Sequence, residues 1–121
     1  MRLIAAIAAA ALLAGFTVQG ASACDRGDIT ILQSNWRVDG RVVRVAGELK
    51  NGCATDTAIQ LQAIYRKESG EIVHVSDFWP AMTNNIRAGE TFGFSTLEPI
   101  ASQGVAKVDV KVISVRQWSS R

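Results

Sequence analysis

Histidine, cysteine and tyrosine are scarce in this chain, and their scarcity narrows its chemistry. The 121 residues include one His, two Cys and one Tyr. A lone His74 has no second imidazole with which to build a metal centre, and the two cysteines do not form a C-x-x-C motif. The G-x-S-x-G and phosphate-loop motifs are also missing. We therefore expect no enzymatic activity, no metal and no cofactor.

An excess of charge of one sign is missing as well. The chain has 13 Lys and Arg against 11 Asp and Glu, which gives a formal net charge of +2. Proteins that bind nucleic acid usually carry a marked positive excess on one face, and such an excess is not seen here. The sequence therefore predicts no nucleic-acid partner.

Long apolar runs are confined to the beginning of the chain. Residues 3–16 carry no charge, Arg2 precedes them, and Ala21-Ser22-Ala23 follows them. A basic residue, a short apolar stretch and small residues at a cleavage site are typical of a bacterial export signal, and the stretch is too short to span a membrane. We expect residues 1–23 to be a signal peptide. Residues 24–121 would then form one periplasmic or secreted domain without a transmembrane segment.

The rest of the chain has the two-residue alternation of β-strands rather than a helical period. Residues 29–37 and 42–50 flank Asp39-Gly40, a dipeptide typical of a two-residue hairpin turn. Centring the turn on this dipeptide places Leu32 opposite Gly47, where a glycine leaves space for a large neighbour.

This register has two consequences at the open end of the hairpin. Ile29 and Ile31 fall on the polar side, so either another segment covers them or a bulge intervenes. Cys24 and Cys53 lie at the same end, where an even pair of cysteines in an oxidising compartment favours a disulfide. The alternative is a lipid anchor at Cys24, which is disfavoured because Ala21 stands where a lipobox usually has Leu, Val or Ile.

Four further strands are predicted at residues 57–66, 71–79, 91–97 and 105–118, with a bulge within residues 113–115 of the last one. Their inward faces would be formed by Ile59, Leu61, Ala63 and Tyr65, by Phe92 and Phe94, and by Ala106, Val108, Val110 and Val112. Six or seven short antiparallel strands in a domain of this size predict an all-β sandwich without helices beyond single turns.

Short motifs along these strands resemble a known family. Residues 47–51 (GELKN) are similar to a G-x-(apolar)-x-N signature, and residues 88–94 (AGETFGF) are similar to P-G-E-x-x-x-F. The alternation over residues 59–65, followed by Gly70, also fits. Residues 29–115 thus resemble the FxLYD-type domains of bacterial envelopes. The resemblance implies an immunoglobulin-like sandwich that acts as a binding or structural module without general catalytic activity.

One segment stands out as a candidate contact surface, at the end of the fourth predicted strand. Neighbouring strand residues point to opposite faces, so one of two adjacent aromatic rings would enter the core and leave the other for a partner. The alternative is that the proline turns the chain and both rings cap the core. The candidate residues are Phe78, Trp79, Pro80, Met82, Asn84 and Asn85.

A second candidate surface is the basic stripe of Arg37, Arg41 and Arg44, for which a solvated strand face is the simpler interpretation. Together these observations predict an exported, non-enzymatic envelope module that binds another protein or supports an envelope structure. The alternative is a secreted modulator or inhibitor of an extracytoplasmic hydrolase, which would use an end loop anchored by the disulfide.

Overall fold

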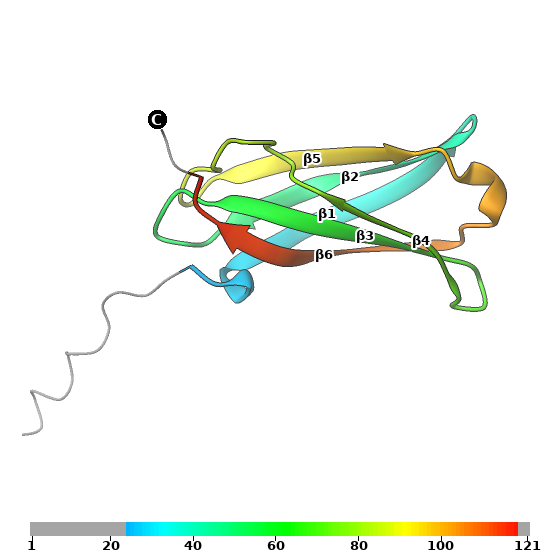
Figure 1. Ribbon diagram of the computed structural model, residues 1–121, viewed down its shortest axis with the longest axis horizontal. Coiled ribbons are helices and arrows are strands. Elements are labelled where there is room, and N and C mark those ends of the chain that lie inside the picture. The colour runs from blue at the N-terminus through cyan, green and yellow to red at the C-terminus, as the bar shows by residue number, and fades with distance from the viewer. Residues whose placement is uncertain (1–23, 119–121) are drawn as a thin grey trace, which may run out of the picture.

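The computed structural model describes residues 24–118, and the predicted signal peptide at residues 1–23 lies outside them. The described residues form six strands and two short 3-10 helices (Figure 1). No helix in this range has the length and hydropathy that a membrane crossing needs. In chain order the elements are η1 (Arg26–Asp28), β1 (Ile29–Asp39), β2 (Val42–Asn51), β3 (Ala58–Arg66), β4 (Ile72–Phe78), β5 (Thr91–Glu98), η2 (Ala101–Gln103) and β6 (Lys107–Arg116).

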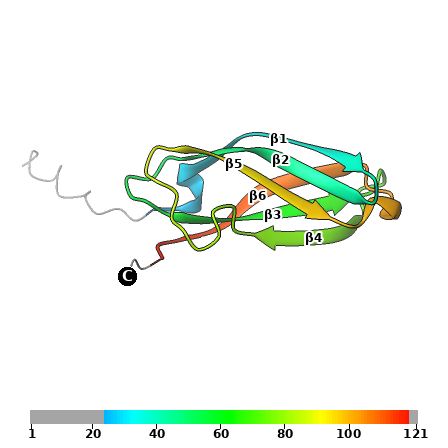
Figure 2. The ribbon, with the colours of Figure 1, turned by 90° about the horizontal axis from the view of Figure 1, so that it is seen from above.

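The strands form two three-stranded antiparallel sheets, with the orders β1-β2-β5 and β4-β3-β6. Figure 2 shows the two sheets stacked as layers. The predicted all-β antiparallel sandwich is therefore confirmed, with six strands. The order corresponds to strands A-B-E facing C′-C-F of an immunoglobulin-type sandwich.

The core lies between the sheets and is built by strict alternation on the two central strands. In β3 the predicted inward residues Ile59, Leu61, Ala63 and Tyr65 are all buried, and in β2 Val43, Val45 and Leu49 are buried. Phe94 of β5 is buried, while Phe92 and the β6 residues Val108, Val110 and Val112 pack at the margin. Ala106 was predicted to point inward, but it is exposed and precedes β6.

The predicted register of the first hairpin was wrong by two residues between the turn and the bulge at Leu32, and by one residue beyond that bulge. Asp39 remains in the strand and pairs with Val42, so the turn residues are Gly40 and Arg41. Gly40 has a φ of 66°. A turn with a left-handed glycine in its first central position is of the Gly-X kind rather than the Asp-Gly kind, and this shifts every pair along the hairpin. Gly47 consequently faces Ser34 instead of Leu32.

Bulges adjust β1, β4 and β6, three of the four edge strands of the sandwich. In β1 the register shifts between Ile31 and Gln33, which leaves Leu32 exposed and Ile29 buried. Of the two outcomes expected for Ile29, the bulge is the one that occurs. In β6 a shift opposite Gln60 leaves Ile113 unpaired, as the broken alternation predicted.

Candidate functional site

The predicted contact residues leave β4 and enter a loop that runs from Trp79 to Glu90 at one end of the sandwich (Figure 2). Two successive turns open this loop. The Met82 amide donates to the Trp79 carbonyl oxygen at 2.9 Å, and the Asn84 amide donates to that of Ala81 at 3.0 Å. Pro80 is the second residue of the first turn, a position that suits its fixed φ. The loop therefore begins with a defined shape.

The two adjacent rings have different environments. Phe78 is the last residue of β4 and packs on the core, with its ring centroid 6.2 Å from that of Phe94. Trp79 lies just outside the strand and is half-buried, with its ring 5.1 Å from that of Trp118. The Arg116 guanidinium lies 4.6 Å from the centroid of the Trp118 ring. Trp79, Trp118 and Arg116 thus form a cluster, with the two indole rings tilted by 54°, that supports the loop.

Asn85 fastens the loop to the segment that follows β6. Its side-chain amide donates to the Trp118 carbonyl oxygen at 3.3 Å, and its Oδ1 accepts from the Trp118 amide at 3.0 Å. Both ends of the Asn85 side chain are therefore occupied within the protein. Asn84, by contrast, is exposed.

Met82 is the apolar side chain that the loop presents to solvent. It is 73% exposed, the largest exposed fraction among the exposed large hydrophobic residues of the described chain. Its φ is 58°, in the left-handed region that residues other than glycine rarely adopt. Such a conformation costs about 1–2 kcal/mol, so the surrounding turns must hold it in place.

The buried side-chain amide of Asn51 hydrogen-bonds the loop from the core side. Its Nδ2 donates to the carbonyl oxygens of Ile86, Thr55 and Arg87 at 2.9, 3.2 and 3.3 Å. Its Oδ1 accepts from the Cys53 amide at 2.9 Å. Asn51 is fully buried, and it joins the end of β2 to two loops at once. Sequence reasoning did not assign Asn51 to the site, although the G-x-(apolar)-x-N motif contains it.

Another polar cluster lies on the inner faces of β4 and β5. Glu98 accepts hydrogen bonds from His74 Nε2 at 3.0 Å and from Ser76 Oγ at 2.9 Å, and so joins the edges of the two sheets. Nucleophilic catalysis by a serine requires the histidine to accept the hydroxyl proton directly. Here the Glu98 carboxylate lies between the two side chains and joins β4 to β5, and we call this arrangement the Glu98 clasp.

Tyr65 lies beside this clasp, with its ring 5.4 Å from that of His74. Its hydroxyl is buried and has no hydrogen-bond partner among the described residues. Burial, with a smaller contribution from the negative charge of Glu98, raises the pKa of Tyr65 to about 12. The phenol is protonated at physiological pH, as an ordinary tyrosine is, and its ionisation is moved further into the alkaline range.

Cys24 and Cys53 form the predicted disulfide, with their Cα atoms 5.3 Å apart. Asp28 lies close enough that its carboxylate and the two sulfurs fall within 4.8 Å of one another. The sulfurs are bonded to each other, so they do not offer the thiolates that a metal would bind. The same bond occupies the Cys24 sulfur that a lipid anchor would need.

The basic stripe is partly neutralised by one carboxylate. Asp39 Oδ2 lies 3.7 Å from the Arg37 guanidinium and 3.5 Å from that of Arg44. Arg41 lies in the β1–β2 turn. Figure 1 shows this turn and the loop that follows β4 at opposite ends of the sandwich. The stripe is therefore less available for a partner than the sequence alone suggests, apart from Arg41.

Comparisons with models of known protein families, with curated proteins and with solved structures found no match. The resemblance to the FxLYD-type domains thus stays a prediction. The immunoglobulin-type strand order does not decide it, because many domains of unrelated function share that order. Function has to be inferred from the geometry of this chain.

Proposed function

We propose that this chain is an exported, non-enzymatic module that binds another protein through the loop beginning at Trp79. The observation that carries the proposal is Met82, an apolar side chain held in solvent by a left-handed backbone. A flexible, apolar side chain at a loop tip suits contact with a partner surface.

The support beneath Met82 strengthens the proposal. Three contacts fix the loop from inside the molecule, namely the tilted Trp79–Trp118 ring pair, the two hydrogen bonds of the Asn85 side chain and the buried Asn51 side-chain amide. A loop that is already ordered loses little conformational entropy on binding. Of the predicted contact residues, we therefore assign Met82 and Asn84 to the contact itself, and Phe78, Trp79, Pro80 and Asn85 to its support.

The non-enzymatic part of the proposal rests on the clasp chemistry and on the sequence. Glu98 hydrogen-bonds both His74 and Ser76, so neither side chain is paired with the other as a nucleophile and its base. Export rests on the predicted signal peptide, and the Cys24–Cys53 disulfide is consistent with an oxidising compartment.

The test is capture of partners from periplasmic extract with immobilised protein and its Met82→Gly variant. Glycine removes the side chain and tolerates the left-handed φ, so the variant should keep its stability within about 1 kcal/mol. We expect partner binding to weaken by more than about 1 kcal/mol, or roughly fivefold. Ile72→Ala is the matched control, because Ile72 is 48% exposed and begins β4, whereas the contact loop follows the last residue of that strand. Equal capture by all three proteins would contradict the proposal.

A hydrolase inhibitor is the second candidate, and the position of the disulfide favours it. Cys53 follows Asn51 by two residues and donates its amide proton to the side chain that holds the loop. A probe loop anchored by a covalent bond is the feature expected of such an inhibitor. If the captured partner is a hydrolase, its activity should fall on adding the protein and recover with Met82→Gly. Unchanged hydrolysis would leave simple binding as the function.

A further inference from the structure

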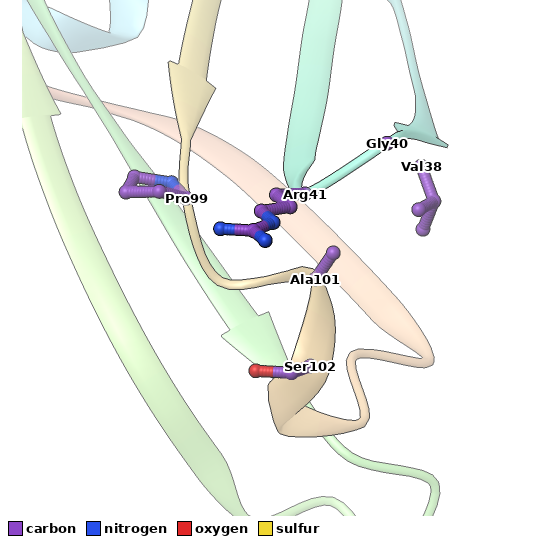
Figure 3. Close-up of a pocket in the computed structure, with 6 residues that line it drawn as sticks. All are labelled: Val38, Gly40, Arg41, Pro99, Ala101 and Ser102. Atoms are coloured by element: carbon purple, nitrogen blue, oxygen red, sulfur yellow. The ribbon is translucent and has the colours of Figure 1, made fainter.

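A hollow lies at the end of the sandwich opposite to the contact loop. It has a volume of about 660 Å³ and is lined by Val38, Gly40, Arg41, Pro99, Ala101 and Ser102 (Figure 3). Two segments distant in sequence build it, namely the β1–β2 turn and the start of the β5–β6 connection. The Ala101 amide donates to the Arg41 carbonyl oxygen at 3.2 Å, which ties the two segments together.

The charges around the hollow leave one cation available. Asp39 is shared by Arg37 and Arg44, and the Glu98 carboxylate is held by His74 and Ser76. No ion pair or side-chain hydrogen bond involves Arg41 within residues 24–118. Figure 3 shows its side chain directed toward Pro99, across the hollow. An anion entering the hollow would therefore meet a guanidinium without competition from a neighbouring carboxylate.

The lining residues other than Arg41 indicate which chemical group the ligand would carry beside its negative charge. Val38, Pro99 and Ala101 offer apolar surface, and Val38 is 53% exposed. Ser102 adds one hydroxyl, while Arg41 is the only charged residue in the lining. One planar guanidinium matches a single carboxylate through two parallel hydrogen bonds, whereas a phosphate dianion usually gathers several donors. We propose that this hollow binds small aliphatic carboxylates, with Arg41 pairing the carboxylate and the apolar wall receiving the chain.

The proposal is tested with hexanoate as the probe, by NMR titration of the purified protein. We expect saturable shifts confined to the lining residues, and clearly weaker shifts with hexanol and hexylamine, which keep the chain but lack the negative charge. Arg41→Gln keeps the backbone carbonyl that Ala101 needs and should weaken hexanoate binding about tenfold, as expected for loss of a charge-assisted pair. Arg37→Gln is the matched control and should leave hexanoate binding unchanged, because Arg37 pairs with Asp39 outside the hollow.

Two results would overturn the proposal. One is the absence of saturable shifts at the lining residues, and the other is equal hexanoate binding by Arg41→Gln and Arg37→Gln. Folding of each variant is checked from the dispersion of the same spectra. Met82→Gly should bind hexanoate as the unmodified protein does, so this site and the contact loop can fail independently.

Discussion

Gly47 in β2 lies so close to the ring of Phe94 in β5 that a β-carbon at Gly47 would stand 2.7 Å from Phe94 Cζ. The same β-carbon would overlap the Gln33 carbonyl oxygen of β1 and lie 2.9 Å from Ser34 Cα. The missing side chain at this one position thus lets three strands pack together. The neighbour that fills the space is Phe94, in place of the Leu32 expected from the predicted hairpin register.

Gly47→Ala should therefore destabilise the domain by about 2–3 kcal/mol, because the overpacked core must move backbone as well as side-chain atoms. Gly93→Ala is the matched control, since a β-carbon there meets nothing nearer than the Gly47 carbonyl oxygen at 3.9 Å. It should change stability by less than about 1 kcal/mol. Urea unfolding of both variants provides the comparison, and equal midpoints would contradict it.

Asn51→Ala should lower the free energy of unfolding by about 3 kcal/mol. The change removes the side-chain Nδ2 that donates to three carbonyl oxygens and the Oδ1 that accepts from the Cys53 amide. These groups would then lose a hydrogen-bond partner at a fully buried position. Hydrogen exchange should also become faster at the Ile86 amide, because the Ile86 carbonyl oxygen keeps only the Thr57 amide as its donor. Asn35→Ala on the exposed face of β1 serves as the control and should stay within about 0.5 kcal/mol. A similar loss in both variants would show that Asn51 is not a fastening point.

Stability should fall as the pH rises above about 10, the pKa of tyrosine in an unfolded chain. Because the folded-state pKa of Tyr65 is raised to about 12, the contribution is fully present below pH 10 and is lost as the pH rises through 12. The total is up to about 3 kcal/mol. The chain has one Tyr, so ultraviolet absorbance of the tyrosinate reports on it alone.

Tyr65→Phe is the control for this pH dependence. It removes a buried hydroxyl without a partner and should leave stability at neutral pH unchanged or slightly increased. The fall in stability between about pH 10 and pH 12 should become smaller in this variant. An absorbance midpoint near 10 in the folded protein would show that the hydroxyl is hydrated.

Reduction of the disulfide should destabilise the domain by about 3–4 kcal/mol, from the entropy of a loop closed over a sequence separation of 29. The double variant Cys24→Ser, Cys53→Ser should show a comparable loss with or without reductant. Intact mass before and after reduction verifies the bond in protein from the native host. A lipid adduct on Cys24 would show that the anchored form is made instead.

The sequence predicted the sandwich well because alternation on β2 and β3 reports burial directly. Val43, Val45 and Leu49 could point only one way if the polar residues between them were to meet water. The hairpin register was harder to predict, since Asp39-Gly40 and Gly40-Arg41 both provide a glycine at the turn. The choice between them depends on cross-strand packing, which a local motif does not contain.

The candidate site was predicted in outline only. The segment from Phe78 to Asn85 was recognised by composition, but the division between Met82 and its supports depends on Trp118 and Asn51, which are distant in sequence. A local pattern does not show that both the Nδ2 and the Oδ1 of Asn85 hydrogen-bond the backbone of Trp118. Nor does it show that Met82 adopts a left-handed backbone, which arises from two consecutive turns.

The Cys24–Cys53 bond also has a consequence for how copies of this chain can associate. β1 is an edge strand that begins five residues after Cys24, and β2 ends two residues before Cys53. An edge strand pairs with only one neighbour in its sheet, so it is well placed for domain swapping, in which two molecules exchange it. Here the covalent link returns β1 to its own β2, so exchange between oxidised molecules would require β1 to leave while still tethered. The oxidised protein should therefore resist swapped dimers that the reduced protein can form.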